Sequence, residues 1–246
     1  MMTETRTVTT NGTAYSYLFT RKRVKNFNLR VKEDGTVLVS APVSASLARV
    51  DAFVLANAAF IDRARKKLRE RQAAAPAPLT LVTGDVLPIW GVLHTVVLLT
   101  GKKREAKREN GQLLLTVKDP ASMAERHRCF TDFLDREAKE TLTARTAALT
   151  PLFAPKPSSP PLLTFRTMKS KWGVCRPREH RVTLNRNLVY LPPALADYVI
   201  CHELAHFHHA DHSAAFWQTL AAVLPEYRSL RRALNAYPLP VLSQPE

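Results

Sequence analysis

Hydrophobic and polar residues alternate along an early stretch of the chain, between Ala14 and Ser40. The alternation is interrupted at Glu33-Asp34-Gly35, and one expected face carries Phe27, Leu29 and Val31. A period of two is typical of β-strands with one buried face, and a glycine-containing break between two such runs is typical of a hairpin. We therefore expect this stretch to form a β-hairpin.

A second strand-rich stretch extends from Leu79 to Val117, where glycines separate short apolar runs. The clearest strands are His94–Leu99 and Gln112–Val117, which are rich in aliphatic and β-branched residues. The segment between them, Lys102–Asn110, is mostly charged. We expect it to be an exposed hairpin tip.

Apolar residues spaced three and four apart predict two amphipathic helices. Ser46 is expected to cap the first helix, whose apolar positions are Leu47, Val50, Val54, Ala58, Ile61 and Leu68. Asp119 and Pro120 are expected to be the N-cap and first-turn proline of a long helix that ends near Leu149. Its inward-facing residues would be Phe130, Phe133, Leu134, Ala138 and Leu142.

The C-terminal third is predicted to combine two strands with several helices. The strands are Leu162–Met168 and Arg181–Leu188, and they flank a turn at Arg176–His180. Pro192-Pro193 is expected to open a helix that continues to about His209. Two more helices follow, at about 213–223 and 226–236.

Two proline-rich segments, Gln72–Pro78 and Ala154–Pro161, interrupt these patterns and are interpreted as linkers or extended connections. The chain is accordingly predicted to have three regions: a β-hairpin and helix in 1–78, a strand region in 79–120, and a helix-rich region in 121–246. Strands dominate early and helices late, which indicates the α+β class. No internal repeat is evident in the sequence.

Composition narrows the class of protein. The 246 residues include 46% hydrophobic and 23% charged residues, which is typical of a globular protein. No apolar run is long enough to span a membrane, and residues 1–12 are polar, without the apolar core of a secretory signal. The three cysteines are odd in number and widely spaced, so a disulfide framework is not expected. We expect a cytoplasmic protein without membrane contact.

The strongest candidate for chemistry is the segment Cys201–His206, which reads CHELAH. On a helix, His202 and His206 lie one turn apart on the same face, so both imidazoles can reach one metal ion. Glu203 is rotated by about 100° from His202. It would therefore lie beside the metal, where a carboxylate can take a proton from an attacking water and deliver it to a leaving amine.

A catalytic zinc needs a third protein ligand, and the sequence offers four candidates: His208, His209, His212 and Glu226. His208 points to the wrong face, and a continuous helix would hold His209 too far along. His212 gives the spacing HExxH-x5-H, provided that the helix ends between His209 and Asp211 and the chain turns back. Asp211 is a plausible turn residue because aspartate tolerates the left-handed conformation. We favour His212 and keep Glu226 as the alternative.

Several motifs follow one another in order through the C-terminal third. They are Lys169–Cys175 (KSKWGVC), Val182–Asn185 (VTLN), Cys201–His206 (CHELAH), His212–Trp217 (HSAAFW) and Leu224–Tyr227 (LPEY). This series resembles the YgjP-like metallopeptidase family, related to SprT-like proteins, in which the corresponding patterns are RWGSC, LN-x-x-L, HELxH, NHSxxFW and LPDY. A looser resemblance extends to Leu29-Arg30-Val31, Asp34-Gly35 and Ala41-Pro42.

The resemblance implies a helical, zincin-like catalytic domain with a β-hairpin and one Zn²⁺ per chain. Its ligands would be His202, His206 and His212, and Glu203 would be the base. The chain departs from the family pattern at Lys171, Val174 and Asp211, where the family has arginine, serine and asparagine. Lysine lacks the planar fork of arginine, so a bidentate role at Lys171 would be weakened.

The hairpin beside the metal is the candidate substrate site. Trp172, Gly173 and Cys175 are expected to line a groove in which an extended peptide adds as a strand. The alternative is that Trp172 and Trp217 are core residues and that Cys175 is an inert buried thiol.

Two functions from different classes are compatible with the sequence. The first is a zinc-dependent peptidase that acts on peptides or proteins. The second is a nucleic-acid-associated zinc protein, either a protease recruited to DNA or a non-catalytic zinc module, because the net charge is +15. The cations cluster at residues 21–32, 63–71 and 102–108. Glu203 favours the first, since a structural zinc needs no free carboxylate and usually has four protein ligands.

Overall fold

The computed structural model describes residues 3–32, 34–74 and 78–243, with side chains omitted for 71–74. The chain divides into two compact units, Met1–Pro76 and Ala77–Glu246, which are described separately. The sequence had instead predicted three regions. In the structure, residues of 79–120 and 121–246 share one hydrophobic core. The fold is α+β, as predicted.

The first unit contains a four-stranded sheet in the order β1-β2-β4-β3. The strands are β1 (Thr3–Thr10), β2 (Thr13–Lys22), β3 (Asn28–Val31) and β4 (Val37–Pro42). β1 pairs antiparallel with β2, β3 pairs antiparallel with β4, and β2 and β4 run parallel. The predicted hairpin over 14–40 is thus wrong in part: β3 and β4 form a hairpin around the predicted turn, whereas β2 pairs with β4 in parallel through a crossover.

Two helices follow where one was predicted, α1 (Leu47–Ala56) and α2 (Ala58–Ala74). The cap is as predicted, since the Ser46 side chain accepts a hydrogen bond from the N–H of Arg49. The break lies at Asn57, whose side-chain amide donates to the carbonyl of Phe53 at 2.8 Å. Asparagine favours such local bonds over helix continuation. Apolar residues of the sheet and α1, including Tyr17, form the core of this unit.

The second unit begins with another four-stranded sheet, in the order β5-β6-β8-β7. Its strands are β5 (Val86–Ile89), β6 (Val92–Thr100), β7 (Glu105–Glu109) and β8 (Gln112–Val117). The predicted strands at 94–99 and 112–117 lie within β6 and β8. The predicted exposed tip, Lys102–Asn110, is wrong in part, because Glu105–Glu109 pairs with β8 as an edge strand.

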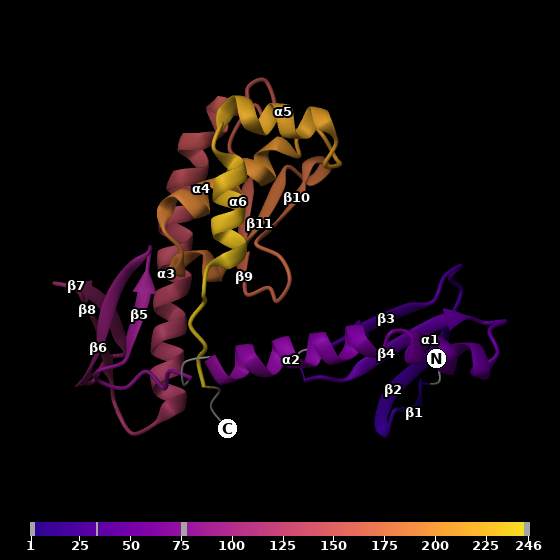
Figure 1. The fold of residues 1–246 in the computed structure, drawn as a ribbon. Coiled ribbons are helices and arrows are strands. Elements are labelled where there is room, and N and C mark those ends of the chain that lie inside the picture. Colours follow the sequence, from indigo (N-terminus) through magenta and orange to yellow (C-terminus); the bar gives the residue numbers. More distant parts are fainter. Residues whose placement is uncertain (1–2, 33, 75–77, 244–246) are drawn as a thin grey trace. The chain divides into compact units, whose positions relative to one another are not determined.

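Helix α3 (Met123–Leu149) runs between this sheet and the remaining elements (Figure 1). Its N-cap is Ser122 and not Asp119, because the Ser122 hydroxyl accepts a hydrogen bond from the N–H of Glu125. Asp119 instead accepts one from Ala121 in the turn before the helix. The five residues predicted to face inward are all buried. α3 contacts β7 and β8 and also packs on α4 and β9.

The third sheet and three helices complete the second unit. The strands β9 (Leu162–Arg166), β10 (Gly173–Arg176) and β11 (Arg181–Asn185) form a sheet in the order β10-β11-β9. β11 is parallel to β9 and antiparallel to β10, so β10 lies at an edge. The helices are α4 (Pro193–Ala205), α5 (Ala214–Val223) and α6 (Tyr227–Ala236). In the part of the chain that the structure describes, no helix has the length and apolarity required to cross a bilayer.

Candidate metal centre

Helix α4 supplies His202 and Glu203, and its C-cap residue is His206. Proline occupies its first turn, and nine of its residues are buried, which fixes the helix within the core. His202 and His206 are half-buried, and their ring centroids are 5.0 Å apart. The helix therefore presents two imidazoles on one face and a carboxylate beside them, the geometry that the four-residue spacing predicts.

The end of α4 allows His212 to reach the same point. α4 ends at Ala205, about one turn earlier than predicted, and the N–H groups of His208 and His209 both bond the carbonyl of Ala205. The predicted left-handed residue at Asp211 is wrong: positive φ angles occur at other described residues. Asp211 instead accepts a hydrogen bond from the N–H of Ser213, which turns the chain into α5.

These turns bring three imidazoles together. One nitrogen of each of His202, His206 and His212 lies within 4.8 Å of the others, a grouping that could hold a metal ion. The Nε2 atoms of His202 and His212 are 3.0 Å apart. Two ligands at about 2.0–2.1 Å in tetrahedral geometry would be separated by roughly 3.3 Å. The observed spacing is thus close to that of a metal site.

The imidazoles are prepared to act as neutral ligands. Nδ1 of His206 lies 2.9 Å from the carbonyl oxygen of His209, so this nitrogen carries the proton and Nε2 keeps its lone pair. Burial lowers the pKa of His202 to about 3, with further contributions from His206, His212 and Arg231. Burial likewise lowers the pKa of His206. Metal ligation requires the unprotonated ring, which these shifts favour.

Glu203 is buried against the edge strand β10. Burial raises its pKa to about 7, while the backbone N–H of Cys175 and the charge of Lys171 act in the opposite direction. Gly173 lies directly over the carboxylate: a Cβ atom at this position would come within 2.5 Å of Oε1 of Glu203. A glycine is therefore needed opposite Glu203.

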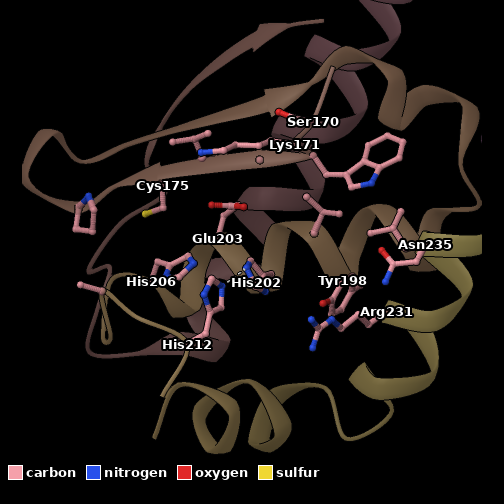
Figure 2. A pocket seen from close by; sticks show the side chains of 17 residues that line it. Ser170, Lys171, Cys175, Tyr198, His202, Glu203, His206, His212, Arg231 and Asn235 are labelled. Carbon is pink, nitrogen blue, oxygen red and sulfur yellow. Dashed lines mark hydrogen bonds between the residues drawn. The ribbon is translucent and has the colours of Figure 1, made fainter. Parts of the chain in front are cut away.

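A cavity of about 630 Å³ opens over these residues (Figure 2). Its walls include the three histidines and Glu203 on one side and β10 on the other. The structure thus brings Trp172, Gly173 and Cys175 to the same hollow as the histidines. A second hollow of about 570 Å³ also touches Pro177, His206 and Ala210, so the two meet beside His206.

The other candidate ligands lie elsewhere. Nε2 of His208 contacts the carbonyl of Phe153 at 2.7 Å, and Nε2 of His209 contacts the hydroxyl of Thr219 at 3.0 Å. Glu226 is the N-cap residue of α6 and is not part of the histidine group. Cys201 is buried in the core, and burial raises the pKa of its thiol to about 12.

Trp172 and Cys175 combine the two roles considered from the sequence, groove lining and core packing, whereas Trp217 has the second role only. Trp172 and Cys175 line the cavity and also pack against the core. Burial, with the charge of Glu203, raises the pKa of Cys175 to about 12, so this thiol is not reactive at neutral pH. Trp217 packs against the core and stacks on His212, with ring centroids 5.7 Å apart.

Three features of the site were not predicted from the sequence. Tyr198, Arg231 and Asn235 also line the cavity, the last two from α6. The four-residue spacing of Arg231 and Asn235 places them on one helical face, but nothing in the sequence indicates what that face meets.

The second feature that was not predicted is the role of Asn185. It is buried, and its side-chain amide donates to the carbonyls of Met168 and Lys171, at 2.8 Å each, which fixes the segment before β10. The third is the steric requirement at Gly173.

Comparison with known proteins places the chain in a family. No curated protein sequence matches it. Among solved structures, it is similar to the metallopeptidase zymogen of Pyrococcus abyssi abylysin, with 20% identity, 41% of this chain and 99% of that chain covered, and a TM-score of 0.35. So low a score supports no structural argument. The family model described as YgjP-like, metallopeptidase domain, matches residues 25–237. The match covers most of the chain, which therefore belongs to the YgjP-like metallopeptidase family.

Proposed function

We propose that the protein is a zinc-dependent peptidase in which His202, His206 and His212 hold one Zn²⁺ per chain. The convergence of three imidazoles beside a buried carboxylate carries this proposal. Three nitrogen ligands with a position left open are typical of catalytic zinc, whereas structural zinc is usually closed by four protein ligands, often cysteines. When bound, zinc polarises the peptide carbonyl and makes water a stronger nucleophile.

Glu203 is the general base in this proposal. Its carboxylate adjoins the histidine group without belonging to it, so it can accept a proton from the attacking water and pass it to the leaving amine. Burial raises its pKa to about 7, which suits a group that must both accept and release a proton near neutral pH. The N–H of Cys175 orients the carboxylate, and Gly173 leaves room for it.

The free edge of β10 is proposed to bind the substrate, in a zincin-like arrangement. The N–H of Asn185 donates to the carbonyl of Trp172 at 2.8 Å, which makes this a bonded pair of the β10–β11 ladder. Since bonded pairs alternate in an antiparallel ladder, the backbone groups of Gly173 and Cys175 point away from β11. These groups lie on the side where a peptide can add as a strand.

The ligand set is tested by zinc content. We expect His212→Ala to lose most bound zinc, because two histidines alone hold the ion weakly. His208→Ala is the matched control, as its ring contacts Phe153 and not the histidine group. Elemental analysis after dialysis gives the stoichiometry, about one ion per chain for wild type. Full zinc content in His212→Ala with loss in Glu226→Gln would assign the third ligand to Glu226.

The alternative, a nucleic-acid-associated zinc protein, rests on the basic clusters. The cluster at 102–108 offers less free charge than the sequence indicated. Arg104 pairs with Asp132, Lys107 with Glu109, and Arg108 with Glu137. The alternative requires retardation of duplex DNA that weakens steeply with salt, with a slope of about −0.9 per phosphate contact. A gel shift at two salt concentrations distinguishes the two functions.

A further inference from the structure

The cavity of about 630 Å³ that contains the three histidines, called the metal cavity below, has an uneven charge distribution. Of the described residues that line it, Glu203 is the only carboxylate, whereas Lys171 and Arg231 are both cations. Glu203 lies against Gly173 of β10, in the same part of the cavity as the histidines (Figure 2). Figure 2 shows Arg231 and Asn235 together at the end of the cavity away from His206. Among the described residues, that end therefore offers a cation and an amide and no acidic group.

Several arginines of this unit form ion pairs, and among the described residues Arg231 is not one of them. Arg145 pairs with Asp197, Arg186 with Asp135, and Arg108 with Glu137. Within the described residues, no carboxylate lies within ion-pair distance of Arg231.

The guanidinium is nevertheless held in place. It lies over the ring of Trp217, 5.1 Å from the centroid, and Trp217 in turn stacks on Tyr227. Stacking uses the face of a guanidinium and leaves the N–H groups at its edge free to donate in plane. A fixed guanidinium with free edges is suited to bidentate recognition of a carboxylate.

Arg231 is poorly suited to a role in metal binding. Its side chain lines the same cavity as the three histidines. A positive charge there opposes a divalent cation by Coulomb repulsion. The arrangement favours an anionic group that enters with the substrate.

We propose that Arg231, with Asn235 beside it, binds a carboxylate of the substrate, so that the enzyme selects peptides with an acidic group near the scissile bond. This inference rests on the peptidase function proposed above and names its substrate class. The carboxylate belongs either to an Asp or Glu side chain or to the peptide C-terminus, since the two are chemically alike.

The test uses fluorogenic peptides that differ only in Glu against Gln, scanned through four positions on each side of the cleavage site and amidated at the C-terminus. Zinc-loaded wild type should cleave the Glu peptide with about tenfold higher kcat/KM at one position. Arg231→Gln should bring that ratio close to one, and Arg231→Glu should invert it toward Lys peptides. A second series compares the Gln peptide as free acid and as amide. A preference confined to this series assigns the carboxylate to the C-terminus.

Arg228→Gln is the matched control. Arg228 lies on the same helix and stacks on Tyr227 at 5.7 Å, but it does not line the metal cavity. Its variant should keep the wild-type ratio. Equal cleavage of acidic and neutral peptides in both series, or an unchanged ratio in Arg231→Gln, would overturn the inference.

A binding measurement separates this inference from the peptidase function. The same peptides, labelled with fluorescein, are titrated with zinc-loaded Glu203→Gln and followed by anisotropy. The anion site is supported if the Glu peptide binds more tightly than the Gln peptide, or the acid more tightly than the amide, and if adding Arg231→Gln removes the difference. This holds even if the wild-type protein hydrolyses no peptide, in which case the peptidase proposal alone fails. If the peptides of each pair bind with equal affinity, the anion site is overturned, whatever the cleavage result.

Discussion

At the residue scale, the role proposed for Glu203 depends on the absence of a side-chain methyl group at position 173. A Cβ at position 173 would lie 2.5 Å from Oε1 and 2.6 Å from Cγ of Glu203. Since Glu203 is buried, its side chain has little room to retreat. We predict that Gly173→Ala lowers kcat by roughly 100-fold, because a displacement of about 1 Å at a reacting group can cost that much. Steady-state kinetics on a cleaved peptide, with zinc content in parallel, measures the effect.

Gly101→Ala is the control for this substitution. Its added Cβ would meet a methyl group of Thr116 at 2.5 Å, a clash of similar size in the sheet formed by β5–β8. It should leave kcat unchanged, because Thr116 is not among the residues that line the metal cavity. Wild-type turnover in Gly173→Ala would show that Glu203 tolerates displacement and would contradict its role as a positioned base.

Sequence reasoning reached the residues of the site unevenly, for a physical reason. Helical periodicity alone places His202, Glu203 and His206 relative to one another, since 3.6 residues per turn fixes their directions. Periodicity cannot decide among later histidines, because that depends on where the helix ends. α4 ends at Ala205, and the chain returns through an Asp211–Ser213 turn. The spacing HExxH-x5-H favoured His212 on the condition that such a turn exists, and the resemblance of the ordered motifs implied the same residue.

At the element scale, Asn185 at the end of β11 fixes the segment that leads into β10. It donates to the carbonyls of Met168 and Lys171 and accepts from the N–H of Asn187. We predict that Asn185→Ala destabilises the protein by about 2–4 kcal/mol, because a buried side chain loses its three hydrogen bonds. Urea unfolding measures the change, with Asn187→Ala as control, since only the backbone of Asn187 takes part. A loss below about 0.5 kcal/mol would contradict this role.

Element boundaries show which local signals were decisive. Ser46 acts as a cap, as predicted, because its hydroxyl can bond an N–H three residues later. The break at Asn57 was missed, since apolar spacing continues through it and only the side-chain bond to Phe53 reveals it. β7 was missed because an exposed edge strand of alternating charges carries no hydrophobic signal.

At the scale of the whole molecule, two sheets share one topology that the sequence did not reveal. In each four-stranded sheet, two antiparallel hairpins meet at a parallel central pair. The strand orders are β1-β2-β4-β3, with β2 and β4 parallel, and β5-β6-β8-β7, with β6 and β8 parallel. The first hairpin turns correspond as well. Asn11-Gly12 and Trp90-Gly91 are both left-handed, with φ of 49° and 75° and of 51° and 77°. Hydrophobic alternation indicates a strand but not its partner, so parallel crossovers are invisible to it.

The first unit should have its own dependence on pH. Asp51 of α1 accepts hydrogen bonds from Arg6 of β1 and from Tyr17 of β2, and chiefly the bond from Arg6 lowers the pKa of Asp51. A carboxyl whose pKa is lower in the folded state stabilises the fold above its unfolded pKa of about 3.9 and loses this contribution as pH falls through the folded value.

We therefore predict that Asp51→Asn destabilises the first unit at pH 6 and that its difference from wild type shrinks as the pH is lowered from about 4 toward 2. Hydrogen exchange of β2 and α1 amides in the full chain measures this. Glu4→Gln is the control, because Glu4 also bonds Arg6 but is more exposed. A difference that stays constant with pH would contradict the ionic role of Asp51.

The central claim is that metal binding and proton transfer reside on different residues: three histidines, His202, His206 and His212, for the metal, and Glu203 of α4 for the proton. It is tested most directly by measuring zinc content and peptide hydrolysis on the same preparation of Glu203→Gln. The amide is close in shape to the carboxylate but cannot accept a proton, and Glu203 lies outside the histidine group. We predict about one zinc per chain, as in wild type, with hydrolysis reduced by at least 100-fold. Wild-type turnover in this variant, on a substrate that the zinc-loaded protein cleaves, would contradict the account.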